Sequence, residues 1–255
     1  MERNISCASM LSKIGSNVLF NLQVLRSSPK IFKRLNELIP QLKRMGYDSL
    51  ILIAITSAFT GLVTAVQASY QTKGYIPVNL ISVMIGKSMM IELAPVLTAL
   101  VLSGKIGAAI AAEIGSMKVS EQIDALESMG VDPIEYLYLP RIVAGIIILP
   151  ILTIYSNIIG ISSAFVVSRF HYNVNFHTFF NNMRHYFYPT DLWGGIAKSV
   201  FFGLVITSMG CYIGSEAKGG AEGVGRVATL TVVYSSILIL IMDFVVATIL
   251  FGGFK

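Results

Sequence analysis

Five long stretches of apolar residues, separated by short polar segments, dominate the sequence. A helix rises about 1.5 Å per residue, so about 20 apolar residues cross the roughly 30 Å hydrocarbon core of a bilayer. The pattern predicts an all-α, polytopic membrane protein with five transmembrane helices, at about residues 50–70, 78–115, 136–168, 192–214 and 227–251. The second and third stretches are too long for one perpendicular crossing, so we expect tilt, kinks or extension beyond the membrane. A short half-helix before Pro95 would be one such interruption.

The segment before the first span, residues 1–48, has an amphipathic pattern. Its apolar residues recur at helical spacing with lysine and arginine between them: Ile31, Phe32, Leu35, Leu38, Ile39 and Leu42. An apolar stripe with a basic flank is typical of an interfacial helix that lies in the headgroup plane. Pro40 should kink or divide this helix. The segment is either a simple anchor for the membrane domain, residues 49–251, or part of a gate beside its first span.

Composition and charge narrow the class of protein. The chain is 54% hydrophobic and 13% charged, whereas about 25% of residues are charged in an average protein. These values exclude a disordered chain and a disulfide scaffold and argue against a water-soluble domain. The net charge is +5, but the sequence shows no soluble basic face. The charge therefore indicates an attraction to lipid headgroups and gives no reason to expect nucleic-acid binding. Eight lysines and arginines precede the first span, which places the N-terminus in the cytoplasm.

The second apolar stretch carries small residues at a spacing of four. One set is Gly104, Ala108 and Ala112, and the other is Gly107, Ala111 and Gly115. Small residues at this spacing let two helix backbones approach closely in lipid. We expect this face to pack against another span or against a second copy of the chain.

Among the charged residues inside the apolar stretches, we single out Glu92, Lys105 and Asp243. Glu92 precedes Pro95, and a carboxylate inside a membrane indicates a cavity or a pathway, unless Glu92 caps a helix end at the outer interface. Lys105 can snorkel only if its helix continues beyond the inner face of the membrane. Asp243 lies about 12 Å inside the fifth stretch. We expect it to hydrogen-bond a serine, threonine or tyrosine of a neighbouring helix, with a protonation or gating role as the alternative.

The polar insert between the second and third stretches predicts a short helix at about residues 120–130. Ser120 is the expected N-cap, Gly130 the C′ residue, and Pro133 prevents continuation. The helix is acidic and carries a small apolar set, Ile123, Leu126 and Met129. An acidic helix with apolar side chains at a membrane face suits docking into a groove of a soluble partner. A solvated loop helix is the alternative.

Other motifs lack the context that gives them meaning. Residues 223–228 fit the dinucleotide pattern G-x-G-x-x-A but follow an apolar stretch instead of a strand, so we expect a flexible loop there. The sequence has no Walker A motif, and its three histidines lack the spacing of a helical zinc site. The sequence shows no set of nucleophile, base and acid. We therefore expect that the chain is not an enzyme and that it binds no metal.

Two long runs resemble a known family. Residues 92–133 read ELAPVLTALVLSGKIGAAIAAEIGSMKVSEQIDALESMGVDP, and residues 219–229 read GGAEGVGRVAT. Both runs resemble the signature of the MlaE-type permeases, which are membrane subunits of MCE (Mla-type) ABC transporters. These systems move phospholipids and related lipids across bacterial envelopes and into chloroplasts. The resemblance extends from about residue 31 to residue 251.

The resemblance implies a homodimeric permease of the bacterial inner membrane, bound to a cytoplasmic ATPase that holds ATP and Mg²⁺. It also implies a periplasmic MCE-domain partner, and some of these systems add a STAS-domain subunit. The chain itself would need no cofactor. The short helix would couple to the ATPase through Ser120, Glu121, Gln122, Asp124, Ala125, Leu126 and Met129. Phospholipid would bind in an apolar cavity with a polar rim, for which we select Leu62, Val66, Tyr70, Glu92, Leu93 and Val96.

Two other functions remain open at this point. An ATP-independent carrier or channel would use Glu92, Lys105 and Asp243 as a relay and would respond to a proton gradient. A membrane scaffold without transport would use the acidic helix only to recruit a soluble protein. The transport direction and the lipid species do not follow from the sequence.

Overall fold

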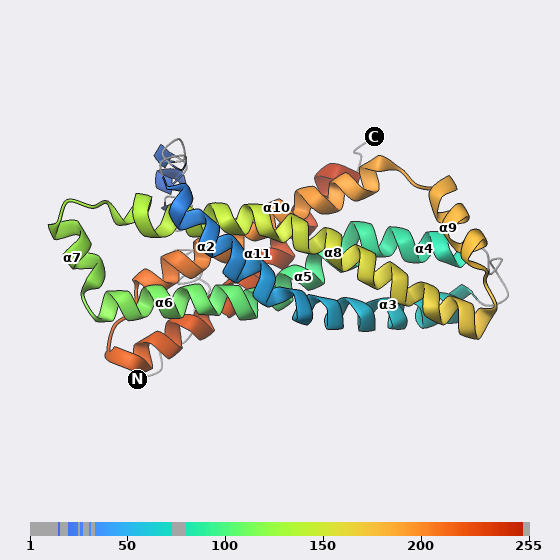
Figure 1. The fold of residues 1–255 in the computed structure, drawn as a ribbon, viewed down its shortest axis with the longest axis horizontal. Helices are drawn as coiled ribbons and strands as arrows, with labels where there is room; N and C mark the ends of the chain where they lie inside the picture. The colour runs from blue at the N-terminus through green and yellow to red at the C-terminus, as the bar shows by residue number, and fades with distance from the viewer. Residues whose placement is uncertain are drawn as a thin grey trace.

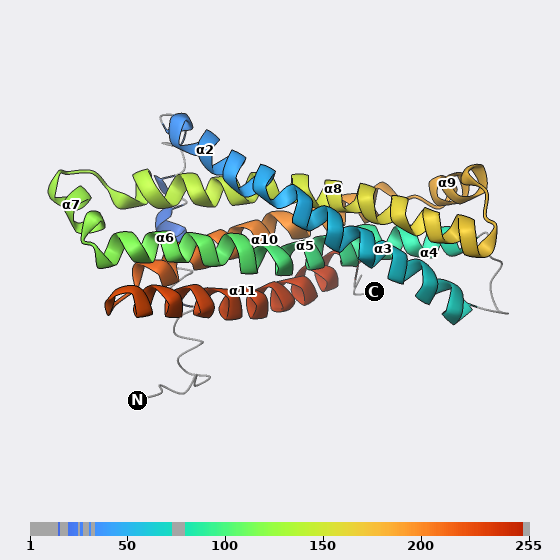
Figure 2. The same ribbon diagram turned by 60° about the horizontal axis from the view of Figure 1, so that its bottom comes forward.

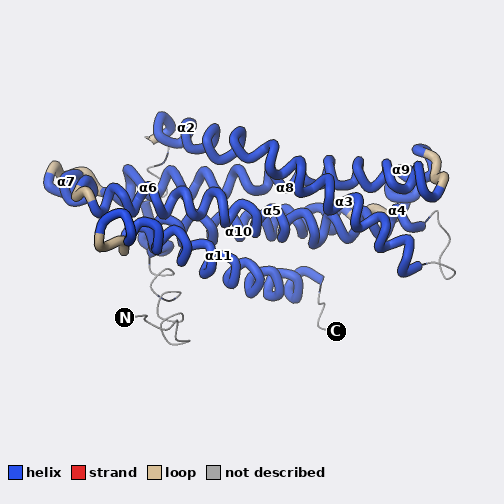
Figure 3. Tube along the Cα trace, turned by 90° about the horizontal axis from the view of Figure 1, so that it is seen from below, coloured by secondary structure: helices blue, strands red, loops and turns tan. Residues whose placement is uncertain are grey.

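The computed structural model describes residues 34–72 and 80–251, together with positions 15, 20–24, 26, 27 and 31. The remaining N-terminal residues, Phe32 among them, lie outside the described part. Within that part every regular element is a helix, and the long helices run side by side in one elongated bundle (Figures 1 and 3). The expected all-α class is therefore confirmed.

In the part of the chain that the structure describes, five helices are long and apolar enough to cross a membrane, as the sequence predicted. They extend over Leu35–Gln71, Ile81–Val119, Ile134–Tyr172, Pro189–Ser215 and Gly220–Leu250. Each continues past the apolar stretch that predicted it at one end or both. The reason is that polar residues at the ends of an apolar stretch also adopt helical structure, so hydropathy marks the membrane-spanning part and not the helix end.

The first long helix consists of α2 (Leu35–Gly46), the 3₁₀ turn η2 (Tyr47–Ser49) and α3 (Leu50–Thr72). Of the two outcomes expected at Pro40, a kink or a division, the division does not occur, since α2 runs through this residue. A proline inside a helix removes one hydrogen bond. Packing compensates here, because α2 lies on α8 and buries Leu38 and Met45.

The second long helix contains two π-helical turns. Its parts are α4 (Ile81–Ser88), η4 (Met89–Leu93), α5 (Ala94–Leu102), η5 (Ser103–Gly107) and α6 (Ala108–Val119). The Ala94 N–H donates to the Met89 carbonyl, five residues back, immediately before Pro95. The wider turn accommodates a proline ring that would clash with the fourth carbonyl before it. The expected half-helix before Pro95 is thus α4, which continues into α5 through a π-turn without a break.

The third long helix also accommodates a proline with a π-turn. The π-turn η6 (Ile134–Tyr138) leads into α8 (Leu139–Tyr172), and the Leu139 N–H donates to the Ile134 carbonyl immediately before Pro140. Helix α8 packs on α2, α3, α5 and α10. A Cβ atom on Gly61 of α3 would overlap the carbonyl oxygen of Gly160 of α8, so only glycine permits this crossing.

The last two long helices are α10 (Pro189–Ser215) and α11 (Gly220–Phe251). Figure 2 shows α11 along one side of the bundle, where it packs on α6 and α10. The expected flexible loop at residues 223–228 is wrong, because these residues form the first turns of α11. The reversal uses Gly219 and Gly220, whose φ angles of 85° and 71° suit glycine.

One set of small residues on the second helix lies in this contact. Gly107, Ala111 and Gly115 are buried against α10 and α11. A Cβ on Gly214 of α10 would stand 2.9 Å from the Ala111 carbonyl oxygen. Gly104, from the other set, is exposed and has no neighbour within 4 Å of an added Cβ, so within this chain it makes no close packing contact.

The two ends of the bundle carry different short helices. The acidic helix α7 (Gln122–Ser128) lies at one end, and α9 (Phe176–His185) lies at the other (Figure 1). At the α9 end, four phenylalanines pack together: Phe165, Phe176, Phe179 and Phe180.

Candidate functional site

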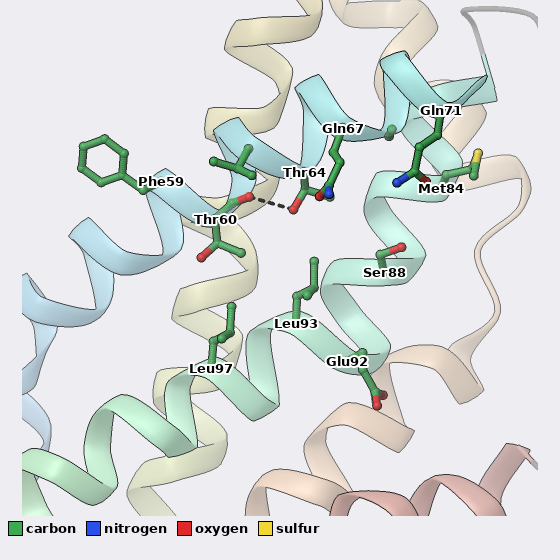
Figure 4. Close-up of a pocket in the computed structure, with 12 residues that line it drawn as sticks. Phe59, Thr60, Thr64, Gln67, Gln71, Met84, Ser88, Glu92, Leu93 and Leu97 are labelled. Carbon is green, nitrogen blue, oxygen red and sulfur yellow. Dashed lines mark hydrogen bonds between the residues drawn. The ribbon is translucent and has the colours of Figure 1, made fainter. Parts of the chain in front are cut away.

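A groove of about 670 Å³ lies between α3 and the α4–α5 part of the second long helix (Figure 4). The α3 wall and the opposite wall contribute the following residues: Phe59, Thr60, Val63, Thr64, Gln67, Ala68 and Gln71, and Met84, Ser88, Glu92, Leu93 and Leu97. A second hollow of about 450 Å³ adjoins it along α3 and shares Val63 and Gln67 with it. The two hollows form one continuous surface on α3.

The walls divide into a polar part and an apolar part. Thr60, Thr64, Gln67 and Gln71 recur at helical spacing and give α3 a polar stripe in the first hollow. Apart from Gln67, the second hollow is lined by apolar and aromatic side chains only. An elongated surface with polar and apolar parts suits an amphiphilic molecule.

The structure brings five of the six expected lipid contacts to this surface. Glu92 and Leu93 line the first hollow, and Leu62, Val66 and Tyr70 line the second. Val96 lines neither. Val96 is partly buried and packs against the bundle core.

A buried lysine joins Glu92 to the fifth long helix. Lys198 of α10 donates a hydrogen bond to Oε2 of Glu92, and its Nζ lies 2.8 Å from Oδ1 of Asp243 on α11. The Lys198 side chain is completely buried, whereas that of Glu92 is 43% exposed. In Figure 4 the Glu92 carboxylate points away from α3, in accord with this pairing. The three residues tie together three of the long helices.

This ion cluster corrects the expectation for Asp243, whose partner among the described residues is Lys198 instead of a serine, threonine or tyrosine. The cluster also differs from the relay of Glu92, Lys105 and Asp243 that a carrier would use. Lys105 is not part of it, because this lysine donates to the backbone carbonyl of Asp48. Sequence reasoning missed Lys198. The signal was present, since a lysine inside the apolar stretch at residues 192–214 is as unusual as an acid.

Close packing positions the lysine. A Cβ on Gly195, one turn before Lys198, would overlap the carbonyl oxygen of Met90 in the π-turn η4. Glycine at this position therefore lets α10 approach the wide turn that carries Glu92.

A second ion cluster holds the bundle together near α7. Glu113 of α6 accepts hydrogen bonds from Arg44 of α2 at 2.6 Å and from Arg141 of α8 at 2.7 Å. Arg141 is buried and also donates to the Leu137 carbonyl in the π-turn η6. The cluster fixes the helices on both sides of α7 relative to α2.

The acidic helix itself is shorter than predicted, seven residues from Gln122 to Ser128. Ser120 is not its N-cap, because the Ser120 hydroxyl donates back to the Ser116 carbonyl and so belongs to the end of α6. Glu121 takes the N-cap position with a φ angle of 58°. The C-terminal end is as predicted, since Gly130 has a φ angle of 74° and its N–H donates to the Glu127 carbonyl.

The helix turns part of its apolar set inward. Ile123 is buried in the bundle core and Leu126 packs partly against it, while Met129 is 70% exposed. The exposed surface consists of the following side chains: Glu121, Gln122, Asp124, Ala125, Glu127, Ser128 and Met129. Asp124 forms an ion pair with Lys118 of α6 at 2.7 Å. The helix is therefore anchored on one face and offers an acidic surface with one large apolar side chain on the other.

Five long apolar helices, an amphiphilic groove with a buried ion cluster and an exposed acidic helix at one end define a multi-pass membrane protein of the permease class. The family model described as Permease MlaE matches residues 38–249. The chain belongs to this family, as its resemblance to the MlaE-type permeases implied.

Relatives support the assignment over most of the chain. A probable ABC transporter permease protein of Rickettsia felis is 37% identical and covers 93% of this chain and 92% of its own length. The intermembrane phospholipid transport system permease protein MlaE of Haemophilus influenzae is 33% identical over 88% of this chain and 87% of its own length. The chloroplastic protein TRIGALACTOSYLDIACYLGLYCEROL 1 of Arabidopsis thaliana is 35% identical over 84% of this chain and 61% of its own length. The chain is thus an ABC transporter permease subunit, the transmembrane component and not the ATPase.

Proposed function

We propose that this chain moves phospholipids between the bacterial inner membrane and a periplasmic MCE-domain partner, as a homodimer driven by a separate ATPase subunit. The observation that carries the proposal is the groove between α3 and the second long helix in a permease of the MlaE family. The name of the Haemophilus influenzae relative, a permease of intermembrane phospholipid transport, supports the same substrate class.

The two hollows match the two parts of a phospholipid. The acyl chains would lie against Leu62, Val66 and Tyr70, where apolar contact with the chains replaces contact with water. The headgroup would lie near the threonine and glutamine side chains of α3 and near Glu92. Polar groups inside a membrane are costly unless a partner satisfies them, and a headgroup is such a partner.

A second copy of the chain would complete the cavity. The groove is open on one side, and apolar side chains of α3 that line it are exposed, such as Phe59 and Val63. Two copies facing each other across this surface would enclose a lipid-sized space between them. The exposed Gly104, beside the half-buried Ala108 and Ala112, offers a further surface for close contact between helices.

The acidic helix would connect the chain to its source of energy. ATP and Mg²⁺ would be bound by the ATPase, and this chain would supply α7 as the docking element. Movement of α7 would reach the bundle through Ile123 in the core and through the ion pair of Lys118 with Asp124. The permease itself has two packing arrangements, one with the cavity open and one with it closed. Its contribution is the difference in free energy between them.

Transfer of labelled phospholipid in proteoliposomes tests the proposal. We expect the assembly of permease, ATPase and MCE-domain protein to move lipid only while it hydrolyses ATP, and to ignore an imposed proton gradient. Transfer by the permease alone, driven by the proton gradient, would support the carrier hypothesis instead. A complex that binds its partners but neither retains nor moves lipid would support the scaffold hypothesis.

A further inference from the structure

The ion cluster around Lys198 carries more negative than positive charge. Glu92 and Asp243 contribute two carboxylates, and Lys198 contributes one ammonium group. The lysine has no exposed surface, and the Asp243 side chain is 16% exposed. The Glu92 side chain is the most exposed of the three and lines the groove. Part of the Glu92 side chain is therefore accessible from the groove, while its carboxylate is turned toward Lys198 and away from α3 (Figure 4).

A single unmatched charge in the interior of a membrane protein is costly. The described residues that line the groove do not supply the missing positive charge, because Glu92 is the only charged residue among them. A cation that enters the groove with the ligand would provide it.

The threonine hydroxyl groups of the groove also favour a cationic ligand, provided that it donates hydrogen bonds. Thr60 donates its hydroxyl proton to the Thr56 carbonyl at 2.8 Å, and Thr64 donates its proton to the Thr60 carbonyl at 2.7 Å. Both oxygens can therefore only accept further hydrogen bonds. The Gln67 and Gln71 side chains add amide N–H donors, which suit a phosphate group.

We infer that the groove prefers phospholipids whose headgroup carries a primary ammonium group, with Glu92 as the acceptor for this group. The inference rests on the proposed function and names the headgroup that the same site selects. An ethanolamine headgroup supplies one positive charge and three N–H donors. A glycerol headgroup supplies no positive charge and leaves the phosphate charge to face a carboxylate. A choline headgroup supplies the charge without the donors.

Lipid retention measures this preference directly. The complete transporter would be reconstituted in nanodiscs with equal amounts of dioleoyl phosphatidylethanolamine and dioleoyl phosphatidylglycerol, then purified, and its retained lipids compared with the bulk bilayer by mass spectrometry. We expect the ethanolamine lipid to be enriched about tenfold over the glycerol lipid, the size of one hydrogen bond to a charged group. N-acetyl phosphatidylethanolamine, which has the same acyl chains but no ammonium group, should not be enriched.

Two substitutions refine the test. Glu92→Gln leaves Lys198 paired with Asp243, so the cluster becomes neutral and the enrichment should fall to about one. Glu222→Gln changes the same functional group at an exposed position of α11 and should keep the enrichment. If the Glu92→Gln variant does not assemble, the unsubstituted protein still tests the headgroup preference. The test is then the retention of phosphatidylethanolamine compared with that of its N-acetyl form.

The outcomes separate this inference from the proposed function. Equal retention of the ethanolamine, glycerol and N-acetyl lipids would overturn the headgroup preference, with the charge then neutralised by a proton or by another protein. Lipid would still be retained in that case, and the proposed permease function would stand. A transporter that retains no lipid above the bulk composition would contradict both.

Discussion

Replacing Lys198 with methionine is expected to lower the free energy of unfolding by about 3–5 kcal/mol, the usual cost of removing one partner from a buried ion pair. Methionine preserves most of the length and apolar volume of the side chain. Glu92 and Asp243 would then face each other without a counter-charge. The measurement is reversible unfolding of the purified chain in mixed micelles.

Two comparisons isolate the electrostatic cause. Lys105→Met removes a hydrogen bond to a backbone carbonyl and should cost about 0.5–1.5 kcal/mol. Adding Glu92→Gln and Asp243→Asn to Lys198→Met removes all three charges and should restore most of the lost stability. If Lys198→Met cost no more than Lys105→Met, the cluster would have no structural importance.

The double substitution Ala125→Asp with Met129→Asp is expected to abolish co-purification of the ATPase subunit and ATP-driven lipid transfer. Both side chains are exposed, Ala125 on α7 and Met129 at its C-cap, so the chain should remain folded. Two added carboxylates would remove the apolar contact and increase the negative charge at the centre of the proposed interface, where desolvation makes unpaired charge costly. The measurement is the amount of ATPase that co-purifies with the tagged permease.

Ala221→Asp provides a matched control for this surface. It places the same substitution at an exposed position in the first turn of α11, where the helix dipole tolerates an acid. The ATPase should bind this variant normally. Full ATPase binding by the α7 double variant would show that the docking element lies elsewhere.

The number and the approximate positions of the membrane-spanning helices follow from the sequence. Span lengths are set by the bilayer, so the apolar stretches predict five helices, and Gly130 predicts the end of α7 through its positive φ angle. Competition between local partners limits such predictions. Ser120 has the right chemistry for an N-cap, yet its hydroxyl donates to the Ser116 carbonyl instead.

The ion cluster shows the other limit. Glu92 and Asp243 can each be recognised as unusual from the sequence, but their pairing requires α10 to lie between the helices that carry them. That order depends on glycines such as Gly195, whose importance becomes visible only when the helix it contacts is known. The same applies to Val96, because the groove face of its helix is decided by the neighbour α3.

The central claim is that the surface between α3 and the second long helix is the lipid site, and two matched aromatic residues test it. Tyr70 on α3 and Phe170 on α8 are both 80% exposed, but of the two only Tyr70 belongs to the surface formed by the groove and the adjoining hollow. ATP-driven lipid transfer in proteoliposomes should be abolished by Tyr70→Asp and largely kept by Phe170→Asp, with both complexes assembled. Equal transfer rates for the two variants would contradict the account.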